Sequence, residues 1–127
     1  LMKILVTDDS KMARKMVIKT LKDSTNKELE IFEAQNGQEA LDLYKELSPK
    51  IVFLDLTMPV MDGFTALEKI KEYDKNAKVV IVSADIQKLS MDRVLALGAF
   101  NFIKKPIDVV KMQQIFKKLD ELEHDGI

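Results

Sequence analysis

The sequence of 127 residues contains no cysteine and no tryptophan, and it has only three prolines and four glycines. Without cysteine the chain can form no disulfide bond and offers no thiolate to a metal ion. No apolar run is longer than about four residues, whereas a membrane-spanning helix needs roughly 20. The N-terminus also lacks the basic and then apolar pattern of a secretory signal. These absences predict a cytoplasmic protein with no membrane partner.

The chain also lacks an excess of charge of either sign. Its 20 basic and 21 acidic residues leave a formal net charge of −1. A protein that binds nucleic acid through its phosphates usually presents a net basic surface, so we expect no direct nucleic-acid partner. The length fits one domain by the usual range of about 100–200 residues. We therefore expect residues 1–127 to form a single domain with its own apolar core.

Short apolar runs alternate with amphipathic stretches along the chain. Strands are predicted at 4–6, 29–34, 51–54, 79–82 and 100–103, and helices at 10–21, 36–47, 64–73, 91–97 and 109–122. Asn36 and Glu39 form a capping-box-like pair, Asp108 is a candidate N-cap, and Gly98 suits the C′ position of a helix. Strict alternation of strand and helix predicts an α/β fold, with a parallel sheet covered by helices on both faces.

Polar residues follow four of the five predicted strands. Asp8 and Asp9 follow the first, Asp55 the third, Ser83 the fourth and Lys105 the fifth. In the strand order 2-1-3-4-5, a common doubly wound arrangement, these four ends are adjacent and the second strand lies at an edge. Open α/β sheets bind their ligands at the carboxyl ends of the strands, beside the point where the order reverses. The pattern predicts a site centred on Asp55.

Each of these residues also has an ordinary structural explanation. An acidic pair at the start of a helix is favoured by the helix dipole. Asp55 alone could form a turn, Lys105 could be a solvated strand end, and Ser83 could be an N-cap. These explanations fail jointly, because chance would have to place all four at adjacent strand ends.

The residues closely resemble a known family. The resemblance rests on Asp8-Asp9, on Asp55 with Met58-Pro59 and Asp62-Gly63, on Ser83-Ala84 and on Lys105-Pro106. It is to the receiver domain of bacterial response regulators, of the CheY-like type, and it extends from about Lys3 to Leu122. It implies a flavodoxin-like three-layer sandwich with a five-stranded parallel sheet in the order 2-1-3-4-5. It also implies a two-component signalling role, in which a histidine kinase or phosphotransfer protein phosphorylates Asp55.

The resemblance further assigns roles to individual residues. Asp9 and Asp55 are expected to ligate Mg²⁺ directly, Asp8 through water, and Thr57 through its backbone carbonyl. A hard cation that keeps several waters suits such a carboxylate set. Lys105 and Ser83 are expected to contact the phosphoryl oxygens, and Ser83 and Phe102 to act as the switch pair. The protein would then be no metabolic enzyme, and it would catalyse only its own phosphorylation and dephosphorylation.

Several positions depart from the family pattern or carry a specific expectation. Thr7 precedes the acidic pair where the family usually has an apolar residue. Thr57 and Asp85 occupy the two positions that tune hydrolysis of the acyl phosphate in the family. The Lys105–Pro106 peptide bond is cis in the family, so we predict a cis bond here, although only about 5–6% of X-Pro bonds are cis.

The output of the protein is expected on the surface made by the fourth helix, fifth strand and fifth helix. The candidate contact residues there are Lys88, Leu89, Phe102, Lys104 and Met112. We expect a stand-alone chemotaxis-type regulator, either a monomer or a phosphorylation-dependent dimer. The alternative is a receiver fragment of a larger regulator. The basic face of the first helix, which includes Arg14, is expected to be solvated. The alternative, which the resemblance implies, is that a kinase or phosphotransfer protein docks near it.

Three rival functions fit the sequence less well than a receiver does. A phosphatase of the haloacid dehalogenase type needs an aspartate two residues after its nucleophile, and that position is Thr57. A flavodoxin-like FMN carrier must receive a phosphate in its first strand–helix loop, where Asp8 and Asp9 would repel it. A degenerate receiver used as a scaffold typically lacks one of the five functional residues, and this chain retains all five.

Overall fold

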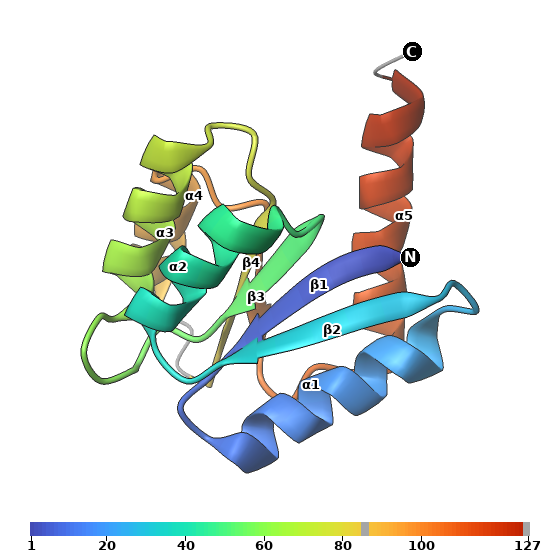
Figure 1. Ribbon diagram of the computed structural model, residues 1–127, viewed down its shortest axis with the longest axis horizontal. Coiled ribbons are helices and arrows are strands. Elements are labelled where there is room, and N and C mark those ends of the chain that lie inside the picture. The colour runs from blue at the N-terminus through green and yellow to red at the C-terminus, as the bar shows by residue number, and fades with distance from the viewer. Residues whose placement is uncertain (85–86, 126–127) are drawn as a thin grey trace.

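The computed structural model describes residues 1–84 and 87–125, and all of their side chains except those of residues 88, 89, 124 and 125. The strands are β1 (Met2–Thr7), β2 (Leu29–Ala34), β3 (Ile51–Leu54), β4 (Val79–Ser83) and β5 (Asn101–Lys104). The helices are α1 (Lys11–Ser24), α2 (Gly37–Leu47), α3 (Gly63–Tyr73), α4 (Lys88–Ala96) and α5 (Val109–Asp125). They alternate strictly along the chain, as predicted (Figure 1). Asp85 lies outside the described residues.

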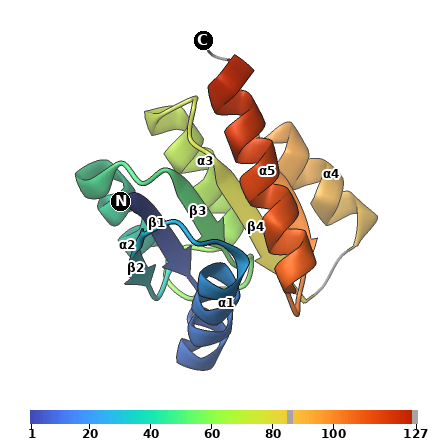
Figure 2. The ribbon, with the colours of Figure 1, turned by 90° about the vertical axis from the view of Figure 1, so that its right-hand side faces the viewer.

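The five strands form one parallel sheet in the order β2-β1-β3-β4-β5, which confirms the predicted topology. Helices α1 and α5 cover one face of the sheet, and α2, α3 and α4 cover the other (Figures 1 and 2). From β1 to β2 the chain moves toward one edge of the sheet, and from β2 onward it moves toward the other edge. This reversal accounts for the division of the connecting helices. Because βαβ crossovers keep one hand, helices that connect strands in opposite directions fall on opposite faces.

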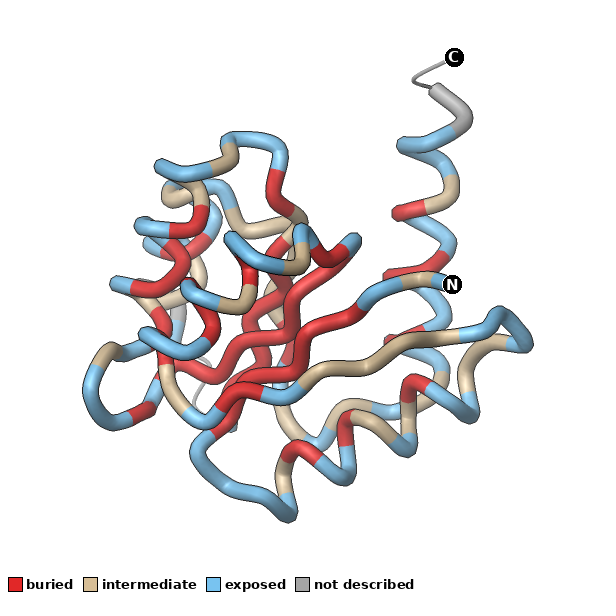
Figure 3. The backbone as a smooth tube through the Cα atoms, in the orientation of Figure 1, coloured by how far each residue is buried: buried red, intermediate tan, exposed pale blue. Residues whose placement is uncertain are grey.

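The core consists of two apolar clusters, one on each face of the sheet. In β3, Ile51 and Phe53 point into the cluster beneath α1 and α5, while Val52 and Leu54 point into the cluster beneath α2, α3 and α4. Successive residues of a strand face opposite sides, so a strand covered on both faces must be apolar throughout. Figure 3 shows the resulting band of buried backbone through the centre of the molecule.

Helix ends agree with the predicted caps. The side chain of Asn36 accepts a hydrogen bond from the backbone N–H of Glu39 at 2.9 Å, and that of Asp108 accepts one from Lys111 at 2.8 Å. Gly98 follows α4 with φ of +94°, which confirms its C′ role. Helix α4 begins at Lys88, three residues before the predicted start at Met91, after Gln87, whose side chain makes no capping hydrogen bond. Because no capping residue marks this end in the sequence, the predicted start of α4 lay three residues too far along the chain.

Within the described ranges, no helix combines the length and apolar character that crossing a bilayer requires.

Candidate functional site

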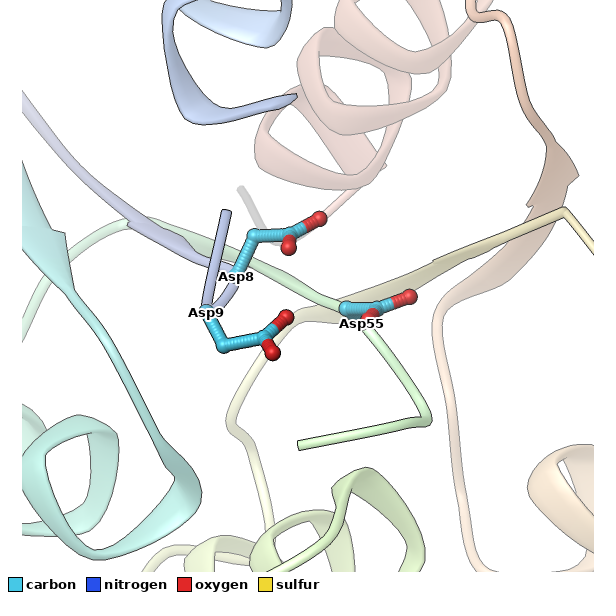
Figure 4. Close-up of side chains that lie close together, drawn as sticks. All are labelled: Asp8, Asp9 and Asp55. Carbon is cyan, nitrogen blue, oxygen red and sulfur yellow. The ribbon is translucent and has the colours of Figure 1, made fainter. Parts of the chain in front are cut away.

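The acidic residues meet where β1 and β3 end. Thr7 pairs with Leu54 in the parallel register, so the chain leaves both strands at the same level. The backbone N–H of Asp55 donates to the carbonyl of Thr7 at 3.1 Å, which extends the pairing by one residue. Asp8, Asp9 and Asp55 each offer a carboxylate oxygen within 4.8 Å of the others (Figure 4). The structure thus brings Asp55 next to the adjacent pair Asp8 and Asp9, which lie far from it in the sequence.

Asp8 is the most firmly held of the three. Its side chain is buried, with 4% of the residue exposed. One carboxylate oxygen accepts a hydrogen bond from the backbone N–H of Ser10 at 2.9 Å, and the other accepts one from Lys105 Nζ at 2.7 Å. Its own backbone N–H donates to the carbonyl of Ala34 on β2 at 3.1 Å. Asp9, by contrast, is exposed.

Lys105 brings a positive charge to the acidic cluster from the end of β5. Its Nζ lies 2.7 Å from Asp8 Oδ2 and 3.3 Å from Asp55 Oδ1. Its backbone N–H donates to the carbonyl of Ser83 at 2.8 Å, which ties the ends of β4 and β5 together. The Lys105–Pro106 peptide bond is cis, as predicted. Burial alone would lower the pKa of Lys105, but the hydrogen bond to Asp8 and the charge of Asp55 outweigh it and raise the pKa.

The electrostatic environment of Asp55 differs from that of an exposed aspartate. Asp55 is buried, and this burial raises the pKa of its carboxyl group. The positive charge of Lys105 opposes the shift, whereas the negative charge of Asp8 adds to it. The net effect is a raised pKa, as expected where carboxylates share a partly desolvated site.

The loop between β3 and α3 folds back tightly over the site. The backbone N–H of Gly63 donates to the carbonyl of Leu56 at 2.9 Å. A Cβ atom at Gly63 would lie 2.2 Å from the carbonyl oxygen of Asp55, so this close approach requires glycine. The N–H of Met61 donates to the carbonyl of Pro59 at 2.7 Å around Val60, which has φ of +68°. This is a γ-turn with positive φ, a rare and strained form.

Thr57 and Ser83 lie on the side of the site that faces α4. Both line a cavity of about 340 Å³, together with Asp62, Phe64 and Ser90 among others. Thr57 is exposed and Ser83 is buried. The structure therefore brings the predicted hydroxyl residue and the predicted carbonyl residue to one cavity beside the acidic cluster.

The structure shows how the residues of the expected output surface are buried and corrects one of them. Phe102 is partly buried against the cluster beneath α2, α3 and α4, and Lys104 is exposed. Met112, however, is 0% exposed and packs in the cluster beneath α1 and α5, so its assignment to a contact surface was wrong. Val110 presents an exposed apolar side chain near the start of α5 instead. The side chains of Lys88 and Leu89 lie outside the described residues.

A groove beside the site was not predicted. It has a volume of about 460 Å³ and runs between α1 and the connection from β5 to α5. Its walls are mainly apolar and include Met16, Val17, Pro106 and Ile107, and Lys105 also lines it. Met16, which the helical spacing of apolar residues places on the stripe with Val17 and Leu21, is 54% exposed at this groove.

Comparison with known proteins gives a consistent result. The sequence model of the response regulator receiver domain matches residues 4–117. The chemotaxis protein CheY of Treponema pallidum is 44% identical over 113 residues, which cover 87% of this chain and 76% of that protein. CheY of Bacillus subtilis is 38% identical, with coverage of 91% and 95%. Among solved structures, a CheX–CheY–BeF3–Mg²⁺ complex from Borrelia burgdorferi aligns with a TM-score of 0.84 at 36% identity, covering 94% of this chain and 89% of that one.

Proposed function

The chain belongs to the response regulator receiver family, and from that premise we propose that Asp55 accepts a phosphoryl group from a histidine kinase or phosphotransfer protein. The observation that carries the proposal is the grouping of Asp8, Asp9, Asp55 and Lys105 at adjacent strand ends. The likeness to several CheY proteins supports a stand-alone regulator of the chemotaxis type. The alternative is one receiver domain of a larger regulator.

The donor set fits a magnesium ion. Three carboxylates offer oxygens within 4.8 Å of one another, and one ammonium group lies against them. With all three ionised, the local charge is −3 + 1 = −2, which one divalent, oxygen-seeking cation would cancel. In the proposed site Asp9 and Asp55 bind the ion directly, and Thr57 adds its backbone carbonyl. Both oxygens of Asp8 already accept hydrogen bonds, which suits contact through water.

The proposed reaction is transfer of a phosphoryl group between two side chains. An Asp55 carboxylate oxygen forms a bond to phosphorus while the P–N bond of the donor's phosphohistidine breaks, and the bonding pair stays on the imidazole nitrogen. Phosphoryl transfer depends mainly on positioning and on stabilising charge. Lys105 Nζ, 3.3 Å from Asp55 Oδ1, is within reach of the incoming phosphoryl oxygens. When bound, Mg²⁺ offsets the repulsion between the carboxylate and the phosphoryl group.

We propose no turnover of small diffusing phosphoesters. The phosphatases that use an aspartyl nucleophile need a carboxylic acid two residues later to protonate the leaving group, and Thr57 stands there. The chain would therefore act only on its own phosphorylation state.

The groove beside α1 is a suitable place for the phosphodonor to dock. It opens next to Lys105, so a protein seated on it would hold its phosphohistidine close to Asp55. Its apolar walls and the exposed lysines of α1 match a partner with apolar side chains and flanking acids. This proposal takes up the docking alternative for the face of α1 in place of a solvated face.

The output would involve Ser83, Phe102 and the surface of α4, β5 and α5. Leu95 on α4 and Val110 on α5 are large apolar residues that are 52% and 62% exposed. Lys104, at the end of β5, is exposed as well, so these three elements each offer a side chain to a partner. The Borrelia burgdorferi relative is seen in a complex with CheX, BeF3 and Mg²⁺, which supports a protein partner of this kind.

Intact-mass spectrometry after incubation with acetyl phosphate and Mg²⁺ tests the proposed function. The wild-type chain should gain one phosphoryl group, and Asp55→Asn should gain none. Asp42→Asn is a matched control, because it removes a carboxylate from the exposed face of α2. Equal labelling of the wild type and Asp55→Asn, or no labelling of the wild type with either acetyl phosphate or the phosphoryl mimic beryllofluoride, would contradict the proposal.

A further inference from the structure

A buried arginine lies immediately behind the acidic pair. The sequence pattern placed Arg14 on the solvated side of α1, but only 7% of the residue is exposed. Its Nη1 donates to the backbone carbonyl of Asp8 at 2.7 Å, and its Nε donates to Glu33 Oε1 at 2.8 Å. Arg14 thus joins α1 to the end of β1 and to β2.

The carbonyl that Arg14 holds belongs to the peptide bond between Asp8 and Asp9. A peptide unit is planar, so fixing the direction of its carbonyl fixes the direction in which the chain enters Asp9. The N–H and both carboxylate oxygens of Asp8 also have partners. With Arg14 on its carbonyl, every polar atom of Asp8 is held.

Asp9 has no comparable support of its own. Within residues 1–84 and 87–125, its carboxylate makes no hydrogen bond and no ion pair. The position of that carboxylate therefore depends on the backbone that precedes it, which is the unit that Arg14 holds.

Glu33 controls both the orientation and the charge of Arg14. Its carboxylate is half-exposed and accepts from Nε, which leaves Nη1 aimed at Asp8. The ion pair is neutral overall, so Arg14 should contribute little net field at the acidic cluster. Its influence on the site is therefore geometric.

We propose that Arg14 is a positioning residue that holds the Asp8–Asp9 peptide and thereby aims the Asp9 carboxylate at the cation shared with Asp55. This inference rests on the proposed role of the acidic cluster in binding Mg²⁺. It goes beyond that role by assigning a buried residue on α1 that contacts neither the ion nor the phosphoryl group. Groups that orient metal ligands in this way typically change metal affinity about 10–100-fold when they are removed.

Arg14→Lys is the informative variant. Lysine keeps the charge but has a single nitrogen in place of the planar fork, so it cannot reproduce both contacts. We expect the dissociation constant for Mg²⁺, measured by calorimetry on the folded chain, to rise about 10–100-fold. The Mg²⁺ concentration for half-maximal labelling by acetyl phosphate should rise in parallel, whereas the rate at saturating Mg²⁺ should stay close to that of the wild type.

Two controls separate positioning from simple destabilisation. Glu33→Gln retains an oxygen acceptor for Nε, so the direction of Nη1 should be kept. The charge of Arg14 that Glu33 no longer neutralises should weaken Mg²⁺ binding by no more than a few-fold, less than the loss of both contacts in Arg14→Lys. Leu21→Ala removes a fully buried side chain from the same helix, far from the acidic pair in sequence. It should lower the melting temperature without changing the dissociation constant for Mg²⁺.

The outcomes distinguish this inference from the proposed function. If the wild type binds Mg²⁺ and Arg14→Lys binds it equally well while melting at a lower temperature, Arg14 is only a structural tether and the inference is wrong. If Leu21→Ala weakens Mg²⁺ binding as much as Arg14→Lys does, the effect comes from general loosening of α1, and the inference is again wrong. If the wild type binds no Mg²⁺, the proposed metal site fails, and the inference fails with it.

Discussion

Replacing Thr7 by valine should stabilise the protein. Thr7 is the last residue of β1 and is 2% exposed. Within the described part of the chain, its Oγ1 is the one buried side-chain polar atom that has no hydrogen-bond partner. The family usually has an apolar residue at this position. Valine has nearly the same shape as threonine and replaces the hydroxyl by a methyl group.

The expected gain follows from the cost of burying an unpaired hydroxyl. Protein mutational data put that cost at about 1–3 kcal/mol. Burial of the additional methyl group contributes about 0.8 kcal/mol in the same direction. Allowing for small adjustments in packing, we expect the free energy of unfolding to rise by about 1–2 kcal/mol. For a domain of this size that corresponds to an increase in melting temperature of roughly 4–8 °C.

Urea unfolding followed by far-UV circular dichroism measures this gain directly. The midpoint should move to higher urea while the slope m stays unchanged, because the surface exposed on unfolding is almost the same. Thr65→Val on the exposed start of α3 is the matched control and should change the free energy by no more than about 0.5 kcal/mol. An unchanged or lower stability of Thr7→Val would refute the reasoning, and would indicate that ordered water satisfies the hydroxyl.

Four further predictions concern other parts of the molecule. Val60→Gly should raise the free energy of unfolding by up to about 2 kcal/mol, because relief of the strained γ-turn outweighs the entropic cost of glycine. Tyr44→Phe should lower it by about 1 kcal/mol at neutral pH, because the 2.7 Å hydrogen bond to Asp74 is lost. That bond holds the pKa of Asp74 below its usual 3.8, so its contribution should persist above that pH and disappear as the pH falls through the lowered pKa. Met16→Asp should slow phosphoryl transfer from a phosphorylated histidine phosphotransfer protein, but leave labelling by acetyl phosphate unchanged. Millimolar Mg²⁺ should raise the melting temperature of the wild type but not of Asp55→Asn, because an ion that binds only the folded site stabilises it by mass action.

Each of these predictions has a contradicting result. Urea unfolding midpoints test the first two predictions. A lower stability of Val60→Gly would contradict the first. A difference in the free energy of unfolding between Tyr44→Phe and the wild type that does not change with pH would contradict the second. For the docking groove, Leu95→Asp is the control, because Leu95 is an equally exposed apolar helix residue on the opposite face of the sheet. Equal slowing by Leu95→Asp would remove the case for the groove. If Mg²⁺ raised the melting temperature of Asp55→Asn as much as that of the wild type, the ion would bind somewhere other than at Asp55.

The sequence pattern predicted the strands, the helices and a parallel sheet, and the resemblance to the receiver family supplied the strand order that the structure confirms. The runs Ile51–Leu54 and Val79–Val82 are too short for helices and fully apolar, so they could only be strands buried on both faces. The chemistry-bearing residues directly follow the strands. The carboxyl ends of parallel strands lie at one edge of the sheet, so the strand order 2-1-3-4-5 brings Asp8, Asp55 and Lys105 together, as the structure shows.

The errors and omissions arise from contacts that sequence spacing does not reveal. Arg14 looked solvated because its burial depends on Glu33, which lies on a different element. Met112 was assigned to a contact surface although it shares the apolar stripe of α5 with Ile115 and Phe116, and that stripe faces the core. The groove depends on how α1 packs beside Pro106, and no local pattern specifies that spacing.

The central claim is that Asp55 carries the phosphoryl group, and the most direct test is to locate that group chemically. Borohydride reduces an aspartyl phosphate to homoserine, which peptide mass spectrometry can assign to a single position. After phosphorylation with acetyl phosphate and Mg²⁺, we predict homoserine at position 55 and at no other aspartate, and none without Mg²⁺. Homoserine at position 8, 9 or 62 in place of 55, or its formation independently of Mg²⁺, would contradict the assignment of Asp55 as the phosphoacceptor.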